Sequence, residues 1–281
     1  MSKRLEFSRG MRALVLAVIA CGATAGIAAD AEATPTVAQI LDRVMAARGG
    51  ATAWSRVLSM GWTGRIDGGE GKPAVPFLMY FQRPNATHFE VLVQNQRAVH
   101  VFDGKHGWKM TPGGELGIQV QDYTPEEVTA ALDACGLDGP LAGAEAKGVK
   151  VAFDGAEMLG SRKVWKLKVT LPSGAMQTHW IDASDYHDLR YDRVTRDRTG
   201  RSGVISVYLN NYQTIEGLTL PLEIVTRGSG GPGSNTMVIE KIAFNPVMQA
   251  NTFQRPDIPG VRHRGVTINT AEAQQGAAPR H

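Results

Sequence analysis

A period-two alternation of apolar and polar residues, repeated over many short segments, most constrains how this chain can fold. In one such segment Met60, Trp62 and Ile66 alternate with Thr63 and Arg65. By the same criterion we expect strands at 59–66, 77–81, 87–93, 97–102, 108–111, 149–153, 163–171, 175–182, 188–196, 203–212, 220–227 and 236–244. Alternation of this kind is typical of strands with one buried face.

The connections between these segments predict antiparallel pairing. Asp103-Gly104 and Pro172-Ser173-Gly174 are hairpin signals, and the 32 glycines and 14 prolines of the chain supply further turns. Strands joined by short turns pair antiparallel. A sheet with this many strands must curl, close or split. The sequence therefore predicts a mainly β protein of the α+β class.

Two segments with helical periodicity interrupt the strands. Residues 37–45 carry apolar side chains at helical spacing, and Gly49-Gly50 ends that pattern. Thr124-Pro125-Glu126-Glu127 is a capping box with proline at the first helical position. An apolar stripe follows, made of Val128, Ala131, Leu132 and Cys135, and we expect this helix to end at Gly136.

The N-terminus reads as an export signal. Residues 1–12 are basic, residues 13–29 are uncharged and apolar or small, and Ala31-Glu32-Ala33 is a small-x-small cleavage site. We therefore predict a signal peptide over 1–33 and a periplasmic location. A second interpretation stays open, because 18–22 resembles a lipobox and Cys21 would then anchor an outer-membrane lipoprotein. We expect one domain over 34–256 and a polar, disordered tail over 257–281.

Charge and cysteine content exclude two classes of protein. The formal net charge of the 281-residue chain is +3, which argues against a nucleic-acid groove. Cleavage after Ala33 would leave Cys135 as one cysteine, so no internal disulfide could support the fold. We interpret Cys135 as a small buried apolar residue rather than a reactive thiol.

A series of short motifs resembles one bacterial family. The motifs are ILDRVMAARGG (40–50), FDGKHGW (102–108), GPL (139–141), WKLKVTLPSG (165–174), HWID (179–182), GLTLPLEI (217–224) and IEKIAFNPVMQANTFQRP (239–256). Their order and spacing resemble the outer-membrane lipoprotein-sorting proteins and their LolA/LolB-like relatives. The resemblance spans about residues 36–256.

This resemblance implies a fold and a kind of ligand. It implies a strongly curved, unclosed antiparallel β half-barrel whose concave face is covered by helices. It also implies an apolar cavity that receives acyl chains of lipids or of acylated proteins. We expect no catalytic residue, metal or cofactor and no nucleic-acid partner. We further expect a monomer, with an inner- or outer-membrane protein as a further partner.

Apolar residues on one face of their strands are the candidates for lining such a cavity. Burial of a chain gains about 0.8 kcal/mol per methylene, so large aromatic, aliphatic and methionine side chains suit the task. The candidate lipid-binding residues are Trp62, Met79, Phe81, Phe89, Val91, Trp165, Leu167, Val169, Met176 and Trp180. The competing interpretation of each is an ordinary core residue.

Motifs for other chemistry are weak. Ser229 lies in Gly228-Ser229-Gly230-Gly231, which reads as a flexible turn rather than a nucleophile elbow. The most metal-like group is His179, Asp182, Asp185, His187 and Asp188, which we interpret as a solvated hairpin. Arg193, Arg196, Arg198 and Arg201 are dense enough to meet phosphates, although a charged exposed strand explains them equally.

Three classes of function follow. The first is a non-enzymatic envelope carrier or receptor that buries acyl chains, with residues 37–45 or 128–135 moving to admit them. The second is an envelope sensor or a module that docks to a membrane transporter. The third is a hydrolase that uses the cluster from His179 to Asp188.

Overall fold

The computed structural model describes residues 34–67, 69, 73–93, 96–112, 117–196, 202–228 and 234–255. The chain divides into two units, Met1–Thr34 and Pro35–His281, and the second is described by itself. The predicted signal peptide 1–33 and the predicted tail 257–281 lie outside the described residues. Cys21 and Ala33 are among these, so the domain boundaries and the cleavage site stay predictions.

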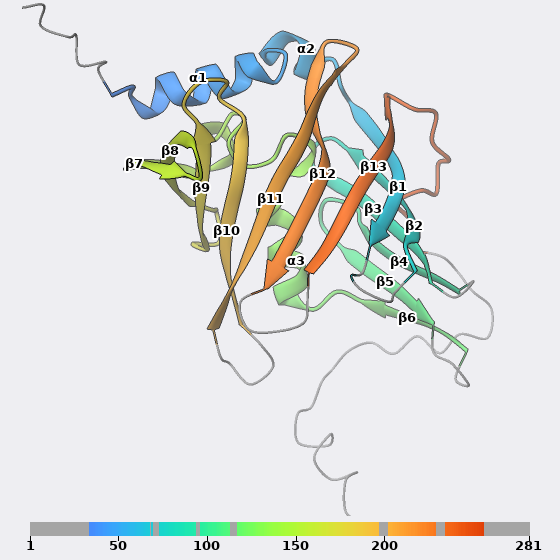
Figure 1. Ribbon diagram of the computed structural model, residues 1–281. Coiled ribbons are helices and arrows are strands. Elements are labelled where there is room, and N and C mark those ends of the chain that lie inside the picture. Colours follow the sequence, from blue (N-terminus) through green and yellow to red (C-terminus); the bar gives the residue numbers. More distant parts are fainter. Residues whose placement is uncertain are drawn as a thin grey trace, which may run out of the picture. The chain divides into compact units, whose positions relative to one another are not determined.

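One antiparallel sheet contains the thirteen strands found in the described residues (Figure 1). The strands before the helical insertion are β1 (Ser59–Asp67), β2 (Val75–Gln82), β3 (Ala86–Val93), β4 (Gln96–Phe102), β5 (Gly107–Pro112) and β6 (Ile118–Asp122). Those after it are β7 (Lys150–Leu159), β8 (Arg162–Thr170), β9 (Met176–Asp182), β10 (Asp188–Arg196), β11 (Ser202–Ile215), β12 (Leu218–Gly228) and β13 (Ser234–Phe244). The sheet is not closed, and the prediction of a mainly β, unclosed antiparallel fold is confirmed.

The strand order explains why the sheet curves. It runs β6-β5-β4-β3-β2-β1-β13-β12-β11-β10-β9-β8-β7, so the last strand returns to pair with the first. The edges, β6 and β7, are joined by residues 123–149. A flat sheet of this many strands would be about 58 Å wide, because neighbouring strands lie about 4.8 Å apart. A compact insertion can connect these edges only when the sheet bends around it.

The insertion covers one face of both halves of the sheet. It contains the helix α3 (Pro125–Asp133) and the short 3₁₀ helices η2 (Gly136–Asp138) and η3 (Glu145–Lys147). Leu137 packs in a cluster with Met60 and Leu218, whereas Leu141 packs in a cluster with Leu167. We call the covered face the concave face, and Figure 1 shows the sheet bending around α3.

Helix α1 (Val37–Ala47) begins where the sequence predicts. Thr36 caps α1 in a capping box with Gln39. Ile40 and Val44 are buried on the sheet, with exposures of 0% and 4%. The short helix α2 (Ala51–Ser55) follows, and its Trp54 is also buried.

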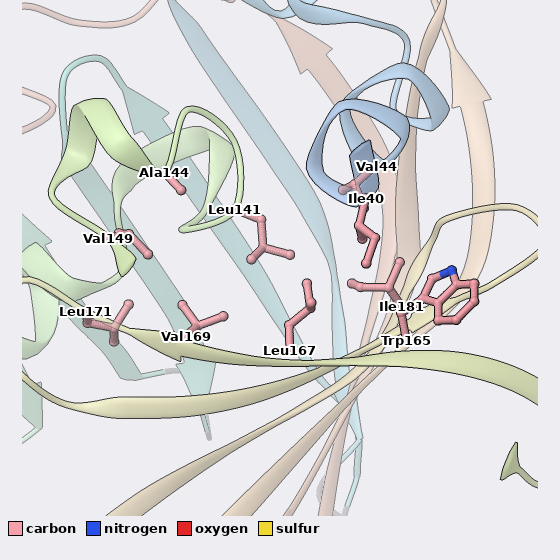
Figure 2. Close-up of a cluster of buried hydrophobic side chains, with 10 residues drawn as sticks. All are labelled: Ile40, Val44, Leu141, Ala144, Val149, Trp165, Leu167, Val169, Leu171 and Ile181. Carbon is pink, nitrogen blue, oxygen red and sulfur yellow. The ribbon is translucent and has the colours of Figure 1, made fainter. Parts of the chain in front are cut away.

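The largest core cluster joins α1, the insertion and the strands β8 and β9. Figure 2 shows Ile40 and Leu141 pointing toward Leu167 and Ile181 from the other side of the cluster. The full cluster is Ile40, Val44, Leu141, Ala144, Val149, Trp165, Leu167, Val169, Leu171 and Ile181. Each large side chain buried here contributes about 1.5–3 kcal/mol, so this cluster holds α1 firmly on the sheet.

Helix α3 differs from its predicted form. It ends at Asp133, and Cys135 adopts a left-handed conformation with φ of 56°. Cys135 is half-buried, and burial raises the pKa of its thiol. No residue of α3 is buried, and Leu132 is 46% exposed. The predicted apolar stripe is therefore only partly covered, which leaves α3 loosely packed.

The segment that follows β13 covers part of the opposite, convex face. Phe253 packs on a cluster formed by Val99, Val101, Trp108, Met110 and Val120. Asn245 fastens the start of this segment, because its Oδ1 accepts hydrogen bonds from the backbone N–H groups of Leu58 and Ser59 at 2.7 and 3.1 Å. In the described part of the chain, no helix has both the length and the hydropathy needed to cross a bilayer.

Candidate ligand-binding cavity

A cavity of about 300 Å³ lies between the concave face and the insertion. Its apolar walls come from β1, β2, β11, β12, α1 and the turn after α3. These apolar residues are Val44, Trp62, Phe81, Ala134, Leu137, Pro140, Leu141, Leu209, Leu220, Pro221 and Ile224. The remaining wall is polar and lies mainly on β9, β10 and the insertion.

Two predicted residues meet in the apolar wall. Trp62 and Phe81 lie on neighbouring strands, with ring centroids 4.8 Å apart in an edge-to-face arrangement. Such aromatic pairs prefer this geometry and provide a large apolar surface. Trp62 and Phe81 therefore line the cavity from the side that the period-two pattern predicts.

Three more predicted residues share this face but lie outside the cavity. Met79 is opposite Trp62 in the sheet, Phe89 is opposite Met79, and Val91 is opposite Phe77. All three predicted side chains are partly buried. They extend the concave apolar surface from the cavity toward β4.

The predicted residues of β8 belong to the core. Trp165, Leu167 and Val169 are buried in the cluster under α1, with exposures of 6%, 0% and 0%. None of them lines the cavity described above. Their contact with a ligand stays a prediction.

The two predicted residues of β9 lie on the convex face. Trp180 donates a hydrogen bond from Nε1 to Glu157, and the cations of Lys166 and Arg190 lie near its ring. Met176 shares this face and is 54% exposed. Alternation predicts which residues share a face, but it does not distinguish the concave face from the convex one.

A buried histidine and a partly buried aspartate form part of the polar wall. His179 is 2% exposed, and its Nδ1 donates to Oδ2 of Asp188 at 2.7 Å, because a carboxylate oxygen can only accept. Its Nε2 lies 2.9 Å from Oε1 of Gln177. The ring of Tyr191 stacks on the imidazole with centroids 5.2 Å apart.

Irregular backbone brings several of these groups to the cavity. A register shift between Asp188 and Arg190 places Asp188 opposite Ile181, on the same face as Tyr191. Asn211 has a positive φ of 52°, and both Leu209 and Tyr212 face the cavity. Such irregularities redirect side chains, and strict alternation cannot predict them.

The predicted metal-like cluster separates into distinct parts. His179, His187 and Asp188 all line the cavity, but His179 bonds to Asp188 while His187 stacks on Tyr212 with centroids 4.2 Å apart. Asp182 and Asp185 organise the turn between β9 and β10. Within the described residues, no three His, Cys, Asp or Glu side chains gather as metal ligands would.

Hydrogen bonds hold Asp182 in that turn. Burial would raise the pKa of Asp182, but the hydroxyl and N–H of Ser184, the N–H of Asp185 and the cation of Arg162 together keep it below its usual value of 3.8. Asp182 is 3% exposed, and its Oδ1 accepts from the N–H of Ser184 at 2.7 Å. This carboxylate is therefore structural.

Two arginines attach the insertion to the rest of the chain beside the cavity. Arg83 forms two hydrogen bonds with the carboxylate of Asp138, at 2.6 and 2.7 Å. Arg48 donates to the carbonyl of Asp138 at 2.8 Å and lies over the ring of Trp54. Burial lowers the pKa of Arg48. We call Arg48, Arg83 and Asp138 the latch.

Within the described part of the chain, the cavity wall contains no serine, threonine, cysteine or lysine, but it does contain aspartate, histidine and tyrosine side chains. His179 has both ring nitrogens in contact with Asp188 and Gln177.

Some predicted features fall outside the description. Ser229, Arg198 and Arg201 lie outside the described residues, and so does the side chain of Arg196. Their interpretations as a turn and as a basic patch stay predictions.

Comparison with solved structures identifies the fold. A LolA superfamily protein from Nitrosomonas europaea is 10% identical to this chain and aligns over 79% of it and 99% of its own length, with a TM-score of 0.53. A DUF1329 family protein from Desulfovibrio piger is 11% identical over 79% of this chain and 98% of its own, with a TM-score of 0.52. A domain described as an outer-membrane lipoprotein-sorting protein, from Vibrio parahaemolyticus, is 12% identical over 78% and 96%, with a TM-score of 0.52.

These matches confirm the resemblance found in the sequence. The chain has the fold of LolA-like lipoprotein-sorting proteins, and at 10–12% identity the likeness concerns the fold alone. The chain matches no protein-family model and no curated protein sequence.

Proposed function

We propose that this protein is a non-enzymatic carrier or receptor of the cell envelope that binds acyl chains of lipids or acylated proteins. The observation that carries the proposal is the cavity of about 300 Å³, walled by aromatic and aliphatic side chains under the insertion. An acyl chain leaving water for such a site gains about 0.8 kcal/mol per methylene. The sorting-protein fold supports the same interpretation.

The insertion is the element that would move to admit a chain. The cavity is at the small end of the range for ligand sites, so a long chain needs more room. No residue of α3 is buried, whereas Ile40 and Val44 fix α1 in the core. Moving α3 exposes far less apolar surface than moving α1 would. Of the two helical segments considered from the sequence, α3 is the better candidate.

The latch would control this movement. Asp138 follows α3 in the chain, lines the cavity and is bound by Arg83 at 2.6 Å. Arg48 holds the carbonyl of the same residue. Moving the turn after α3 would break the contacts of both arginines with Asp138. Access to the cavity would therefore depend on a small number of hydrogen bonds.

The location and partners of the protein follow from this proposal. The predicted signal peptide 1–33 would carry it to the periplasm, or Cys21 would anchor it to the outer membrane. A carrier of this kind receives its cargo from one membrane and delivers it to another. We therefore expect the partners to be acylated molecules and an inner- or outer-membrane protein.

Binding of a fluorescent acyl probe tests the proposal. We expect saturable binding of one probe per protein, abolished by an excess of unlabelled amphiphile of the same chain length. Absence of binding, together with native mass spectra that contain only ligand-free protein, would contradict a carrier function. Capture of a membrane protein by this lipid-free protein would instead favour the sensor or docking module.

A further inference from the structure

The polar wall of the cavity suggests which acyl ligands it selects. We propose that the cavity prefers chains whose polar end carries a neutral hydrogen-bond donor, an amide or a hydroxyl, and that Asp188 accepts that hydrogen bond. The inference rests on the proposed function, because it names the ligand class of the same cavity.

One oxygen of Asp188 is buried and uncommitted. Oδ2 accepts from His179 at 2.7 Å, whereas Oδ1 is buried and has no hydrogen-bond partner within the described part of the chain. A buried acceptor without a partner costs about 1–3 kcal/mol, and more when it is charged. Asp188 lines the cavity, so a ligand there is placed to supply the missing donor.

The donors that line the cavity beside Asp188 make their described hydrogen bonds to atoms other than its Oδ1. The hydroxyl of Tyr212 donates to the backbone carbonyl of Asp188 at 2.8 Å rather than to its carboxylate. Nη1 of Arg48 donates to the carbonyl of Asp138, and Nδ1 of His179 donates to Oδ2 of Asp188. The side chains around Asp188 therefore leave its Oδ1 available to a ligand.

The facing wall supplies a complementary group. Nε1 of Trp62 is also buried without a hydrogen-bond partner among the described residues, and Trp62 lines the same cavity. Two residues of the cavity wall thus hold one buried acceptor and one buried donor without a described partner, beside the apolar wall. An amide carries a donor and an acceptor, and so does a hydroxyl, whereas an ester has acceptors only.

The charge of Asp188 also discriminates between ligands. A fatty carboxylate at Asp188 would bring a second negative charge toward this partly buried carboxylate, and like charges in a low-dielectric site repel. A neutral donor avoids this cost. The cation of Arg48 lines the same cavity, but its Nη1 is bound to the carbonyl of Asp138. The irregular strand at Asp188 and Arg190, which turns Asp188 toward the cavity, gives up regular pairing to place this group.

Competition among four amphiphiles of one chain length tests the inference. Dodecanamide, dodecanol, methyl dodecanoate and dodecanoate would each compete with the fluorescent acyl probe on the full chain. We expect the amide, the alcohol or both to bind at least about tenfold more tightly than the ester, and dodecanoate to bind weakest. If dodecanamide binds more tightly than dodecanol, the ligand is amide-linked; if dodecanol binds more tightly, the ligand is hydroxylated.

Two variants assign the effect to Asp188. Asp188→Asn should reduce the preference for the amide or the alcohol over the ester to less than about threefold. It should also improve dodecanoate binding, because the negative charge of Asp188 is removed. Asp192→Asn is the matched control, since Asp192 pairs with Arg190 away from the cavity. It should leave the preference unchanged.

The outcomes separate the two proposals. If the four amphiphiles fail to bind at all, the proposed function is wrong. If they bind but the ester equals both donors, or if Asp188→Asn keeps the full preference, the selectivity proposal is wrong and the carrier proposal stands. Should Asp188→Asn fail to fold, the comparison of the four amphiphiles on the unaltered protein still decides.

Discussion

Trp62 and Phe81 form an aromatic contact in the apolar wall of the cavity, and Trp62 is also a natural reporter. Its indole contacts Phe81 edge to face and lines the cavity. The other four tryptophans of the chain do not line the cavity. A ligand in the cavity should therefore change the environment of Trp62 more than that of any other tryptophan.

Brominated acyl chains test this placement, because bromine quenches indole fluorescence on contact. We expect saturable quenching, and we expect Trp62→Phe to remove most of it. Trp180→Phe is the control, since Trp180 lies on the convex face beside Lys166 and Arg190. Quenching that survives in Trp62→Phe and disappears in Trp180→Phe would place the ligand on the wrong face.

Sequence patterns predicted only part of the cavity wall, and the reason is the period of the strand. Alternation identified Trp62 and Phe81 correctly as neighbours on one face. It could not predict that Trp180 lies on the convex face. There the indole donates to Glu157 and lies beside the cation of Arg190. Asp188 and Tyr212 were missed as cavity residues because irregular backbone turns them inward.

The latch makes a measurable contribution to stability. Asp138→Asn leaves the partly buried guanidinium of Arg83 without its carboxylate, so we expect the free energy of unfolding to fall by about 2 kcal/mol. Urea denaturation measures this. Glu240→Gln removes the exposed ion pair with Arg65 and should change stability by no more than about 0.5 kcal/mol. Equal losses in the two variants would argue against the latch.

Asp182 gives stability a defined dependence on pH. Its folded-state pKa lies below its usual value of 3.8, so its stabilisation is complete above that value and is lost as the pH falls through the folded pKa. We expect Asp182→Asn to be less stable at neutral pH and to lose less stability than the unaltered protein on acidification. Parallel stability profiles against pH for the two proteins would contradict this role.

The helices of the concave side differ in how they are held. Helix α1 buries Ile40 and Val44 completely or nearly so, whereas α3 buries none of its residues. Both helices begin at a capping box that the sequence contains, at Thr36 and Thr124. Capping thus fixes where a helix begins, but burial decides how strongly it is attached to the sheet.

Hydrogen exchange should resolve this difference. We expect the amides of α3 to exchange at least about tenfold faster than those of α1, because local opening of α3 costs less apolar burial. Addition of an acyl ligand should slow exchange in the turn after α3, where Leu137 and Asp138 line the cavity. Equal protection of the two helices without ligand would contradict the proposal that α3 moves.

The topology of the whole sheet determines where the cavity lies. The insertion leaves one edge strand, crosses the concave face and enters the other edge, while β13 returns to β1. Local sequence patterns predict the strands and their antiparallel pairing. They do not predict the pairing of β1 with β13, which joins residues 169 to 184 positions apart, from Asp67 with Thr236 to Met60 with Phe244. The position of the insertion became apparent only from that long-range pairing.

Other segments of the chain pack on both faces of the sheet. The central claim is that the ligand binds on the concave face. The insertion covers the concave face, and the segment with Phe253 covers part of the convex face beside Trp108. A crystal structure with dodecanamide bound tests the claim directly. We predict the chain between Trp62, Phe81 and Leu220, with its polar end at Asp188. An acyl chain bound at Trp108 on the convex face would contradict the account.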